Sequence, residues 1–226
     1  RANMDAIYTL KALENQHRDA TPEEQETLAN YVGWGGLADA FDAEKTAWTG
    51  EYKELKAALT EEEYAAARAS TLNAHYTSPT VIRAIYEALD GMGFEKGNIL
   101  EPSMGVGNFF GMLPDSMLGS RLYGVELDSI TGRIAQKLYP QAEIKVAGFE
   151  TTDRRDFYDL AVGNVPFGNY RVSDKPYDKL GFSIHNYFFA KALDQVRPGG
   201  IVAFVTSRYT MDSKLSLIHI SEPTRH

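Results

Sequence analysis

The segment 163–168 reads Gly-Asn-Val-Pro-Phe-Gly and directly follows the apolar run 157–162. A β-rich run that stops on Gly-Asn, with a proline shortly after it, is typical of a buried parallel strand that ends on a polar side chain. In open α/β sheets, ligands bind at the carboxyl ends of such strands. Asn164 is therefore a candidate functional residue. The alternative is that strand-Gly-Asn-x-Pro forms an ordinary turn.

A second candidate lies at 99–110, which reads Ile-Leu-Glu-Pro-Ser-Met-Gly-Val-Gly-Asn-Phe-Phe. The pattern predicts a strand, a glycine loop that lets the backbone approach a ligand closely, and a helix start with unpaired N–H groups. A bare Gly-x-Gly also fits dinucleotide enzymes. However, Phe110 stands where their third glycine would be. The carboxylate of Glu101 suits a cationic amino-acid group better than a pyrophosphate.

The next predicted strand ends at Glu126, about twenty residues after the glycine loop, where an acidic residue can accept both hydroxyls of an adenosine ribose. We prefer Glu126 to Asp128 for this role, because Asp128 directly precedes a helix that is predicted to begin near Ser129 and is a typical N-cap. The alternative for Glu126 is a solvated strand end.

These segments resemble the motifs of amino-group methyltransferases that use S-adenosylmethionine, above all the N6-adenine DNA methyltransferases. The acceptor motif of that family, Asn-Pro-Pro-Phe/Tyr, is matched by Asn-Val-Pro-Phe at 164–167, and its motif Asp/Glu-Pro-x-x-Gly-x-Gly is matched at 101–107. The sequence Tyr-Thr-Ser-Pro at 76–79 resembles the Phe/Tyr-Thr-Pro segment that closes over the methionine part of the cofactor. The motifs follow the order of one subgroup of the family across residues 73–212.

A narrower resemblance is to the adenine-specific methylase domains of very large proteins on mobile genetic elements, which are often fused to a superfamily-two helicase. In those proteins Gly-Trp-Gly-Gly and Gly-Asn-Val-Pro-Phe-Gly stand much as they do here, at 33–36 and 163–168. The resemblance implies DNA as a partner and a restriction-modification setting. It also implies further domains of the same polypeptide, including a helicase and a target-recognition region.

By this resemblance, Asn164 and Val165 form the catalytic acceptor pair. The side-chain oxygen of Asn164 and the backbone carbonyl of Val165 would accept the two N–H bonds of the target amine, which directs its lone pair to the methyl group and stabilises the developing positive charge. Pro166 keeps Val165 extended. Phe167 offers a face on which an adenine flipped out of the duplex stacks. No metal and no covalent intermediate are required.

The cofactor site implied by the resemblance comprises Tyr76, Thr77, Glu101, Pro102, Ser103, Gly105, Gly107, Asn108, Glu126, Leu127, Phe149 and Glu150. Three positions depart from the family pattern, and the first is Ser78, which replaces the first proline of the commoner Thr-Pro-Pro. Gly148 stands where an acid usually binds the adenine amino group, so Glu150 is a candidate substitute, and Val165 replaces a proline. Phe149 keeps the aromatic ring that packs on the adenine.

A stretch rich in basic and aromatic residues follows the acceptor motif. Together with Phe167, the side chains of Tyr170, Arg171 and Lys175 are candidates for contacts with the phosphates and bases of a nucleic-acid strand. The alternative is a surface loop without such a role.

The fold class expected from the order of elements is α/β, because apolar strands alternate with helices in the manner of βαβ units and a parallel sheet. The resemblance makes this a Rossmann-like class I methyltransferase sheet, with five of its seven strands present and an N-terminal helical region. The predicted strands lie at 98–101, 121–126, 143–147, 159–163 and 200–206, the last after a Pro-Gly-Gly turn.

The expected organisation has three parts. The helical region at 1–72 begins with a helix from residue 3 to about 19, has capping boxes at Thr21 and Thr60, and has no residue that suggests catalysis. The methyltransferase core is expected at 73–214. Residues 215–226 resemble the translation of a sequencing-library adapter and are expected to be a non-native tail. Arg1 in place of a methionine suggests an internal start.

The 226 residues have a formal net charge of −8, 43% hydrophobic residues and no cysteine. An acidic chain argues against a broad nonspecific nucleic-acid surface, although a separate domain can supply that grip. The lack of cysteine excludes disulfides and thiolate metal sites. Neither a signal peptide nor a membrane span is visible in the sequence, so we expect a cytoplasmic protein.

Two other functions stay open. Glutamine N5-methyltransferases that act on proteins share an Asn-Pro-Pro-Tyr motif for an equally planar amide. A catalytically inactive module that binds cofactor or DNA within a larger helicase-methylase protein is also compatible with Gly148 and Val165.

Overall fold

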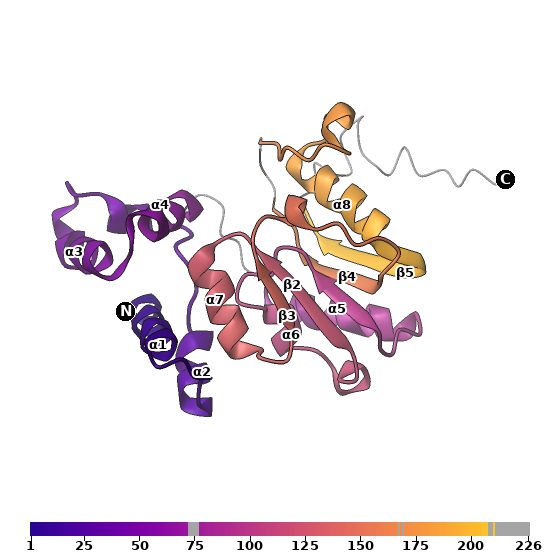
Figure 1. The fold of residues 1–226 in the computed structure, drawn as a ribbon, viewed down its shortest axis with the longest axis horizontal. Coiled ribbons are helices and arrows are strands. Elements are labelled where there is room, and N and C mark those ends of the chain that lie inside the picture. Colours follow the sequence, from indigo (N-terminus) through magenta and orange to yellow (C-terminus); the bar gives the residue numbers. More distant parts are fainter. Residues whose placement is uncertain (72–76, 167, 169, 208–209, 211–226) are drawn as a thin grey trace.

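The computed structural model describes residues 1–71, 77–166, 168, 170–207 and 210, so the predicted tail at 215–226 lies outside the described residues. A helical region precedes an α/β part (Figure 1). The helices are α1 (Ala2–Asn15), α2 (Pro22–Ala29), α3 (Thr49–Ala58), α4 (Glu61–Ser70), α5 (Pro79–Gly91), α6 (Asn108–Gly111), α7 (Ser129–Leu138) and α8 (Ile184–Gln195). The strands are β1 (Asn98–Glu101), β2 (Arg121–Glu126), β3 (Glu143–Val146), β4 (Tyr158–Asn164) and β5 (Val196–Val205).

The five strands form one sheet in the order β3-β2-β1-β4-β5, and all neighbouring strands are parallel. The α/β fold class and the five predicted strands are confirmed. The chain runs from β1 outward to β3 and then returns to the other side of β1 to form β4, so the strand order reverses between β1 and β4. Such a reversal opens a crevice at the carboxyl ends of the strands, where ligands of this class of sheet bind.

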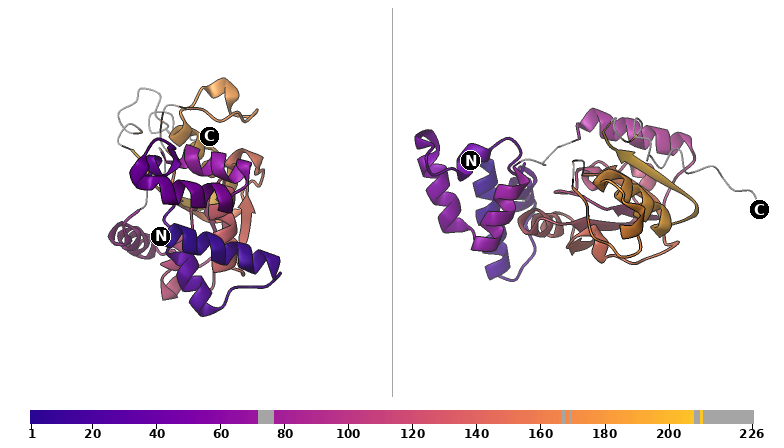
Figure 2. Two further views of the ribbon diagram at one scale, coloured as in Figure 1. Left: turned by 90° about the vertical axis from the view of Figure 1, so that its left-hand side faces the viewer. Right: turned by 90° about the horizontal axis from the view of Figure 1, so that it is seen from above.

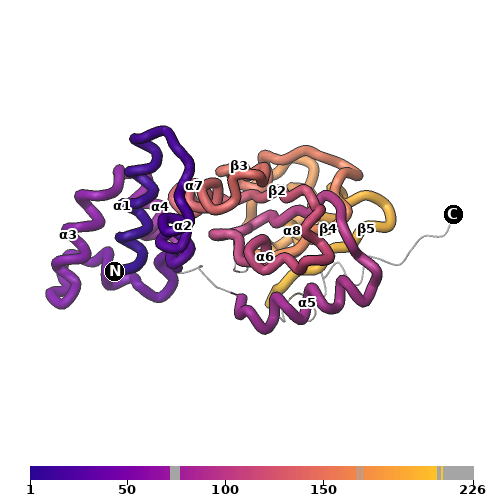
Figure 3. The backbone as a smooth tube through the Cα atoms, turned by 90° about the horizontal axis from the view of Figure 1, so that it is seen from below, coloured from indigo at the N-terminus to yellow at the C-terminus, as the bar shows by residue number. Residues whose placement is uncertain are grey.

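Helices cover both faces of the sheet (Figures 1 and 3). Because successive side chains of a strand point to opposite faces, neighbouring residues of β1 pack on different helices. Ile99 packs with Ile82 of α5 and Phe109 of α6, whereas Leu100 packs with Phe188 of α8. Within the described ranges, no helix has the length and apolarity that crossing a membrane requires.

The helical region starts two of its helices with the predicted capping boxes. Thr21 and Thr60 each accept a hydrogen bond from the N–H of the glutamate three residues later, and that glutamate accepts one from the N–H of the threonine. The predicted end of the first helix near residue 19 is wrong. Helix α1 ends at Asn15, because the chain turns at His17, which has a φ of 50°.

Helices α1, α2 and α4 pack against one helix of the α/β part, α7 (Figure 2). Apolar side chains of the helical region form one buried cluster with Ile130 and Ile134 of α7 and with Val106 of the glycine loop. Trp34 belongs to this cluster and meets Phe41 edge to face at 5.3 Å between ring centroids. The helical region and the sheet therefore share a core through α7.

The turn predicted before the last strand is wrong. Strand β5 already begins at Val196, which pairs with Tyr158, and the next registered pair is Leu160 with Ile201. The extra residues of β5 are accommodated by an irregularity in which Gly199 adopts a φ of 81°. The Pro-Gly-Gly segment therefore lies in an irregular part of β5, between its first pair with β4 and its regular pairing from Ile201 onward.

A buried ion pair fixes the loop that follows β4. The Nζ of Lys191 in α8 lies 2.6 Å from Asp174 Oδ2 and donates a hydrogen bond of 3.1 Å to the backbone carbonyl of Glu150. The hydroxyl of Tyr187 donates to the same Asp174 oxygen at 2.7 Å. The side chains of Lys191 and Asp174 are 5% and 10% exposed. This loop is thereby tied both to α8 and to the segment after β3.

We predict that Lys191→Met lowers the free energy of unfolding by about 3–5 kcal/mol, because it leaves the Asp174 carboxylate buried without its cation. Lys45→Met is the matched control. It removes a pair with Asp39 whose side chains are 51% and 55% exposed, and it should cost less than about 1 kcal/mol. Urea denaturation of both variants measures the difference, and similar losses in the two would contradict the prediction.

Candidate active site

The carboxyl ends of β1, β2 and β4 open into a cavity of about 460 Å³. Its walls come from the glycine loop, the first turn of α7, the segment after β3 and the end of β4. Segments that are far apart in the sequence thus meet in one cavity. The candidate residues that line it are Thr77, Glu101, Pro102, Ser103, Gly105, Asn108, Glu126, Leu127, Phe149, Glu150, Asn164, Val165, Pro166 and Tyr170.

Three of the candidate residues that the structure describes, Gly107, Arg171 and Lys175, are not part of this lining. Arg171 and Lys175 are exposed on the loop after β4. Tyr76 and Phe167 lie outside the described residues. Gly107 belongs to the glycine loop and is buried. In the part of the chain that the structure describes, no group of three or more His, Asp or Glu side chains could hold a metal ion.

The glycine loop depends on the conformation of Gly107. This residue is the N-cap of α6 and has a φ of 84°, in the left-handed region that favours glycine. A Cβ at this position would lie 2.5 Å from a ring carbon of Tyr139. The Tyr139 hydroxyl donates to the Gly107 carbonyl at 2.8 Å. Gly107 therefore determines the backbone course of the loop, although it does not line the cavity.

Glu101 is a buried acid at the base of the cavity. Glu101 is only 2% exposed, and its Oε2 has no hydrogen-bond partner among the described residues. Burial raises the pKa of Glu101 well above its ordinary value, and the neighbouring charge of Glu126 raises it further. A nearby cation would favour the ionised carboxylate and lower the pKa again. The Oε2 of Glu101 is therefore available to a ligand, and a ligand with a positive charge would favour the ionised form of this acid.

Glu126 lies beside the glycine loop and is held by two backbone groups. Its Oε2 accepts a hydrogen bond from the N–H of Gly105, and its Oε1 accepts one from the N–H of Asp128, both at 2.8 Å. Each oxygen keeps a second lone pair for a ligand donor. Burial raises the pKa of Glu126 to about 7, although these hydrogen bonds act to lower it. Asp128 caps α7 through the N–H of Thr131, as predicted.

The carboxylate of Glu150 takes the place of a side chain at position 148. Gly148 has a φ of −70° and a ψ of 150°, which any residue can adopt, so its conformation does not require glycine. A Cβ at this position would overlap the Glu150 carboxylate. Phe149, between them in sequence, is buried and packs against Phe188 at 5.0 Å between ring centroids.

Strand β4 brings Asn164 and Val165 to the cavity next to Glu101. A Cβ at Gly163 would lie 3.3 Å from Cγ of Glu101, so the two strand ends are in close contact. Val165 is buried, and its N–H donates to the carbonyl of Val205 at 3.1 Å. This bond extends the pairing with β5 beyond Asn164. The two motifs therefore meet where β1 and β4 end, and Glu101 and Asn164 line the same cavity.

The helical region supplies a wall that the sequence analysis did not anticipate. Gly33, Ala66, Ala69 and Ser70 all line the cavity. Glycine, alanine and serine at such positions carry no chemical signal that would distinguish them from ordinary helix residues. The only signal in the sequence was the Gly-Trp-Gly-Gly match, which includes Gly33.

Two known proteins are similar in sequence, and no protein-family model matches the chain. One is the Defense against restriction protein B of Escherichia phage P1, 29% identical over 210 residues, which are 90% of this chain and 8% of that protein. The other is the Type II methyltransferase M.CvrRI of Paramecium bursaria Chlorella virus XZ-6E, 34% identical over 92 residues, which are 41% of this chain and 24% of that protein. The chain thus spans only a small part of either relative.

Two solved structures share the fold. A protein from Listeria monocytogenes, assigned as a class I S-adenosylmethionine-dependent methyltransferase, has a TM-score of 0.51 at 13% identity over 95% of this chain and 76% of that one. A protein from Vibrio vulnificus YJ016, assigned as the modification subunit of a type I restriction enzyme, has a TM-score of 0.51 at 15% identity over 80% and 43% of the chains. The chain has the Rossmann-like fold of the class I methyltransferases.

The raised pKa of Glu126 predicts a pH-dependent stability. The folded state binds this proton more tightly than the unfolded chain, so the stabilisation is complete below a pH of about 4.5 and is lost as the pH rises to about 7. The loss is on the order of 3 kcal/mol. Glu126→Gln has no titrating group at this position and should lack this pH-dependent loss, although its amide nitrogen cannot accept one of the two backbone hydrogen bonds. Denaturation of both proteins at low and high pH tests this, and identical pH profiles would contradict it.

Proposed function

We propose that the chain transfers a methyl group from S-adenosylmethionine to the N6 amino group of adenine in DNA. The observation that carries the proposal is that the glycine loop with Glu101 and the segment Asn164-Val165 line the same cavity. A cationic methyl donor and an amine acceptor can therefore be held side by side. In this proposal residues 73–214 form the methyltransferase core.

The residues of the cavity fit S-adenosylmethionine, which supplies a methyl group bonded to a positively charged sulfur. Glu101 offers the cationic part of the molecule a buried carboxyl oxygen that has no hydrogen-bond partner within the described ranges. Glu126 keeps lone pairs for the ribose hydroxyls beside its two backbone hydrogen bonds. Glu150 accepts the adenine amino group in place of an acid at Gly148, and Phe149 packs on the adenine ring.

Asn164 and Val165 prepare the acceptor amine. The exocyclic nitrogen of adenine is a weak nucleophile because its lone pair is conjugated with the ring. Hydrogen bonds from its two N–H groups to the Asn164 side-chain oxygen and the Val165 carbonyl direct the lone pair toward the methyl group and stabilise the positive charge that forms on nitrogen. Tyr170, which is 42% exposed at the cavity, and Phe167 supply rings on which a flipped base can stack.

DNA is the acceptor favoured by the comparisons. The phage P1 relative is named for defense against restriction, and the viral relative is named a type II methyltransferase. One of the structures that share the fold is a restriction modification subunit. Because both relatives are much longer than this chain, the proposal includes further domains of the same polypeptide, among them a helicase and a target-recognition region, which would supply the grip on DNA that an acidic chain lacks.

The direct test is transfer of a labelled methyl group from S-adenosylmethionine to unmethylated DNA, followed by digestion to nucleosides and identification of the product. We expect the label in N6-methyladenine. Asn164→Ala should lower the rate by about 10²–10³, because the developing charge loses one acceptor. Asn30→Ala is the control, since Asn30 is exposed at the end of α2 and its side chain donates to the Glu26 carbonyl of that helix. Its rate should match that of the unaltered protein.

The other outcomes separate the competing functions. Label in methylcytosine would contradict the adenine assignment and keep the DNA assignment. Label in glutamine of added protein, with none in DNA, would indicate a protein methyltransferase. Binding of S-adenosylmethionine without transfer to any acceptor, also in the longer gene product, would indicate an inactive module.

Glu150, two positions after the place where the family has its acid, can be tested by substitution. Glu150→Ala should weaken binding of S-adenosylhomocysteine by about tenfold or more, since the adenine amino group loses its charged acceptor. Because the Glu150 carboxylate lies where a side chain at 148 would lie, Gly148→Asp in the Glu150→Ala background should restore part of the affinity. Calorimetric titration of the two variants measures this, and a double variant no better than Glu150→Ala would contradict it.

A further inference from the structure

Helix α4 and the turn at Gly33 face the glycine loop across the cavity. Ala66, Ala69 and Ser70 lie on successive turns at one side of α4 and line the cavity. Gly33 lines it from the loop after α2, and this loop is fastened to the end of α4 by a hydrogen bond of 3.1 Å from the Gly36 N–H to the Thr71 carbonyl. These small residues leave room between the helical region and the loop on which the cofactor is proposed to lie.

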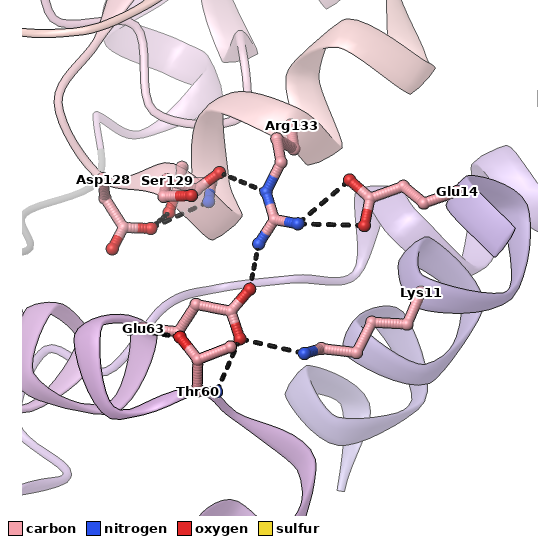
Figure 4. Close-up of polar contacts among 8 residues, drawn as sticks. Lys11, Glu14, Thr60, Glu63, Asp128, Ser129 and Arg133 are labelled. Carbon is pink, nitrogen blue, oxygen red and sulfur yellow. Dashed lines mark hydrogen bonds and ion pairs between the residues drawn. The ribbon is translucent and has the colours of Figure 1, made fainter.

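One carboxylate sets the position of α4. Oε2 of Glu63 accepts hydrogen bonds of 2.9 Å from the backbone N–H of Thr60, the N-cap residue of α4, and from Lys11 of α1 (Figure 4). Oε1 accepts from the Arg133 guanidinium of α7. Glu63 is 9% exposed, and although burial raises its pKa, the bonds from Lys11, Thr60 and Arg133 hold that pKa below its ordinary value. The charged form of Glu63 therefore joins α4 to α1 and α7.

Arg133 connects this junction to the cavity. Its other nitrogens donate to both oxygens of Glu14 in α1, at 3.0 and 2.9 Å, and to the Ser129 carbonyl at 3.1 Å (Figure 4). Ser129 is the first residue of α7, and the neighbouring Asp128 and Thr131 line the cavity. Arg133 thus bonds both to Glu63 of α4 and to the first turn of α7, which forms another wall of the cavity.

We propose that the helical region is part of the cofactor site: Gly33 and the Ala66–Ala69–Ser70 side of α4 contact bound S-adenosylmethionine against the glycine loop, and the Glu63–Arg133 ion pair is the positioning contact that holds this wall in place. The inference rests on the proposed function for the identity of the ligand. It adds a binding surface from a region without chemically reactive residues. It also makes affinity depend on charges that do not touch the ligand.

The first test fills the cavity from α4. Ala69 and Ala65 are both exposed on α4, but only Ala69 lines the cavity, so a large side chain at either position is compatible with folding. Ala69→Trp should weaken binding of S-adenosylhomocysteine by about tenfold or more, whereas Ala65→Trp should leave it within about twofold of the unaltered protein. Calorimetric titration with S-adenosylhomocysteine gives both values.

The second test removes the positioning contact. Glu63→Gln and Glu24→Gln are a matched pair, because both glutamates complete a capping box and both pair with an arginine, Arg133 and Arg18 respectively. Helix α2, which holds Glu24, does not line the cavity. Both variants should lose some thermal stability, but only Glu63→Gln should weaken S-adenosylhomocysteine binding, by about tenfold, which corresponds to about 1.4 kcal/mol.

The outcomes are distinct. Unchanged affinity in Ala69→Trp or in Glu63→Gln would overturn the inference and leave the proposed function intact, and so would equal losses in Glu63→Gln and Glu24→Gln, because these would reflect general loosening. Failure of the unaltered chain to bind S-adenosylhomocysteine would overturn the cofactor assignment together with the inference. Binding without methyl transfer to DNA would leave the inference standing and contradict only the proposed acceptor.

Discussion

The parallel pairing of β1 with β4 is the constraint on which the rest of the site depends. Ile99 and Leu100 are in register with Leu160 and Ala161, so the two strands end side by side although more than fifty residues of sequence, about two βαβ units, separate them. One strand end carries the acid of the glycine motif and the other carries the amide of the acceptor motif. Because Gly163 has no side chain, the second strand can pass against Glu101. A shift of this register would separate the two motifs.

This arrangement has an energetic cost that the fold bears before any ligand binds. Two carboxyl groups lie near each other, the buried Glu101 and the half-buried Glu126, and removal from water raises the pKa of both. Glu126 is compensated by two backbone N–H groups, whereas Oε2 of Glu101 has no partner in the part of the chain that the structure describes. An uncompensated buried polar group is expected where a ligand completes it. In the proposed function, Glu101 is therefore the acid that meets the positive charge of the ligand.

Much of the fold could be predicted from local signals in the sequence. The strand that ends on Asn164, the N-cap at Asp128 and the capping boxes at Thr21 and Thr60 each follow from short-range chemistry, and the structure has them all. The irregular start of β5 could not be predicted, because Pro-Gly-Gly is the same signal for a turn and for an irregular strand. The pairing of Val196 with Tyr158 of β4 decides between them.

The part of the site that the sequence could not indicate depends on tertiary packing alone. Ala69 of α4 has no functional group, and it reaches the cavity only because α4 packs across α7. That packing is decided by contacts between residues distant in sequence, the apolar cluster around Ile130 and Ile134 and the charges of Glu63 and Arg133. A single helix, α7, thus carries a cavity wall at its first turn and the attachment of the helical region along its length. A substitution of Ile134 or Arg133, through which α7 contacts the helical region, would therefore alter the cavity although neither residue lines it.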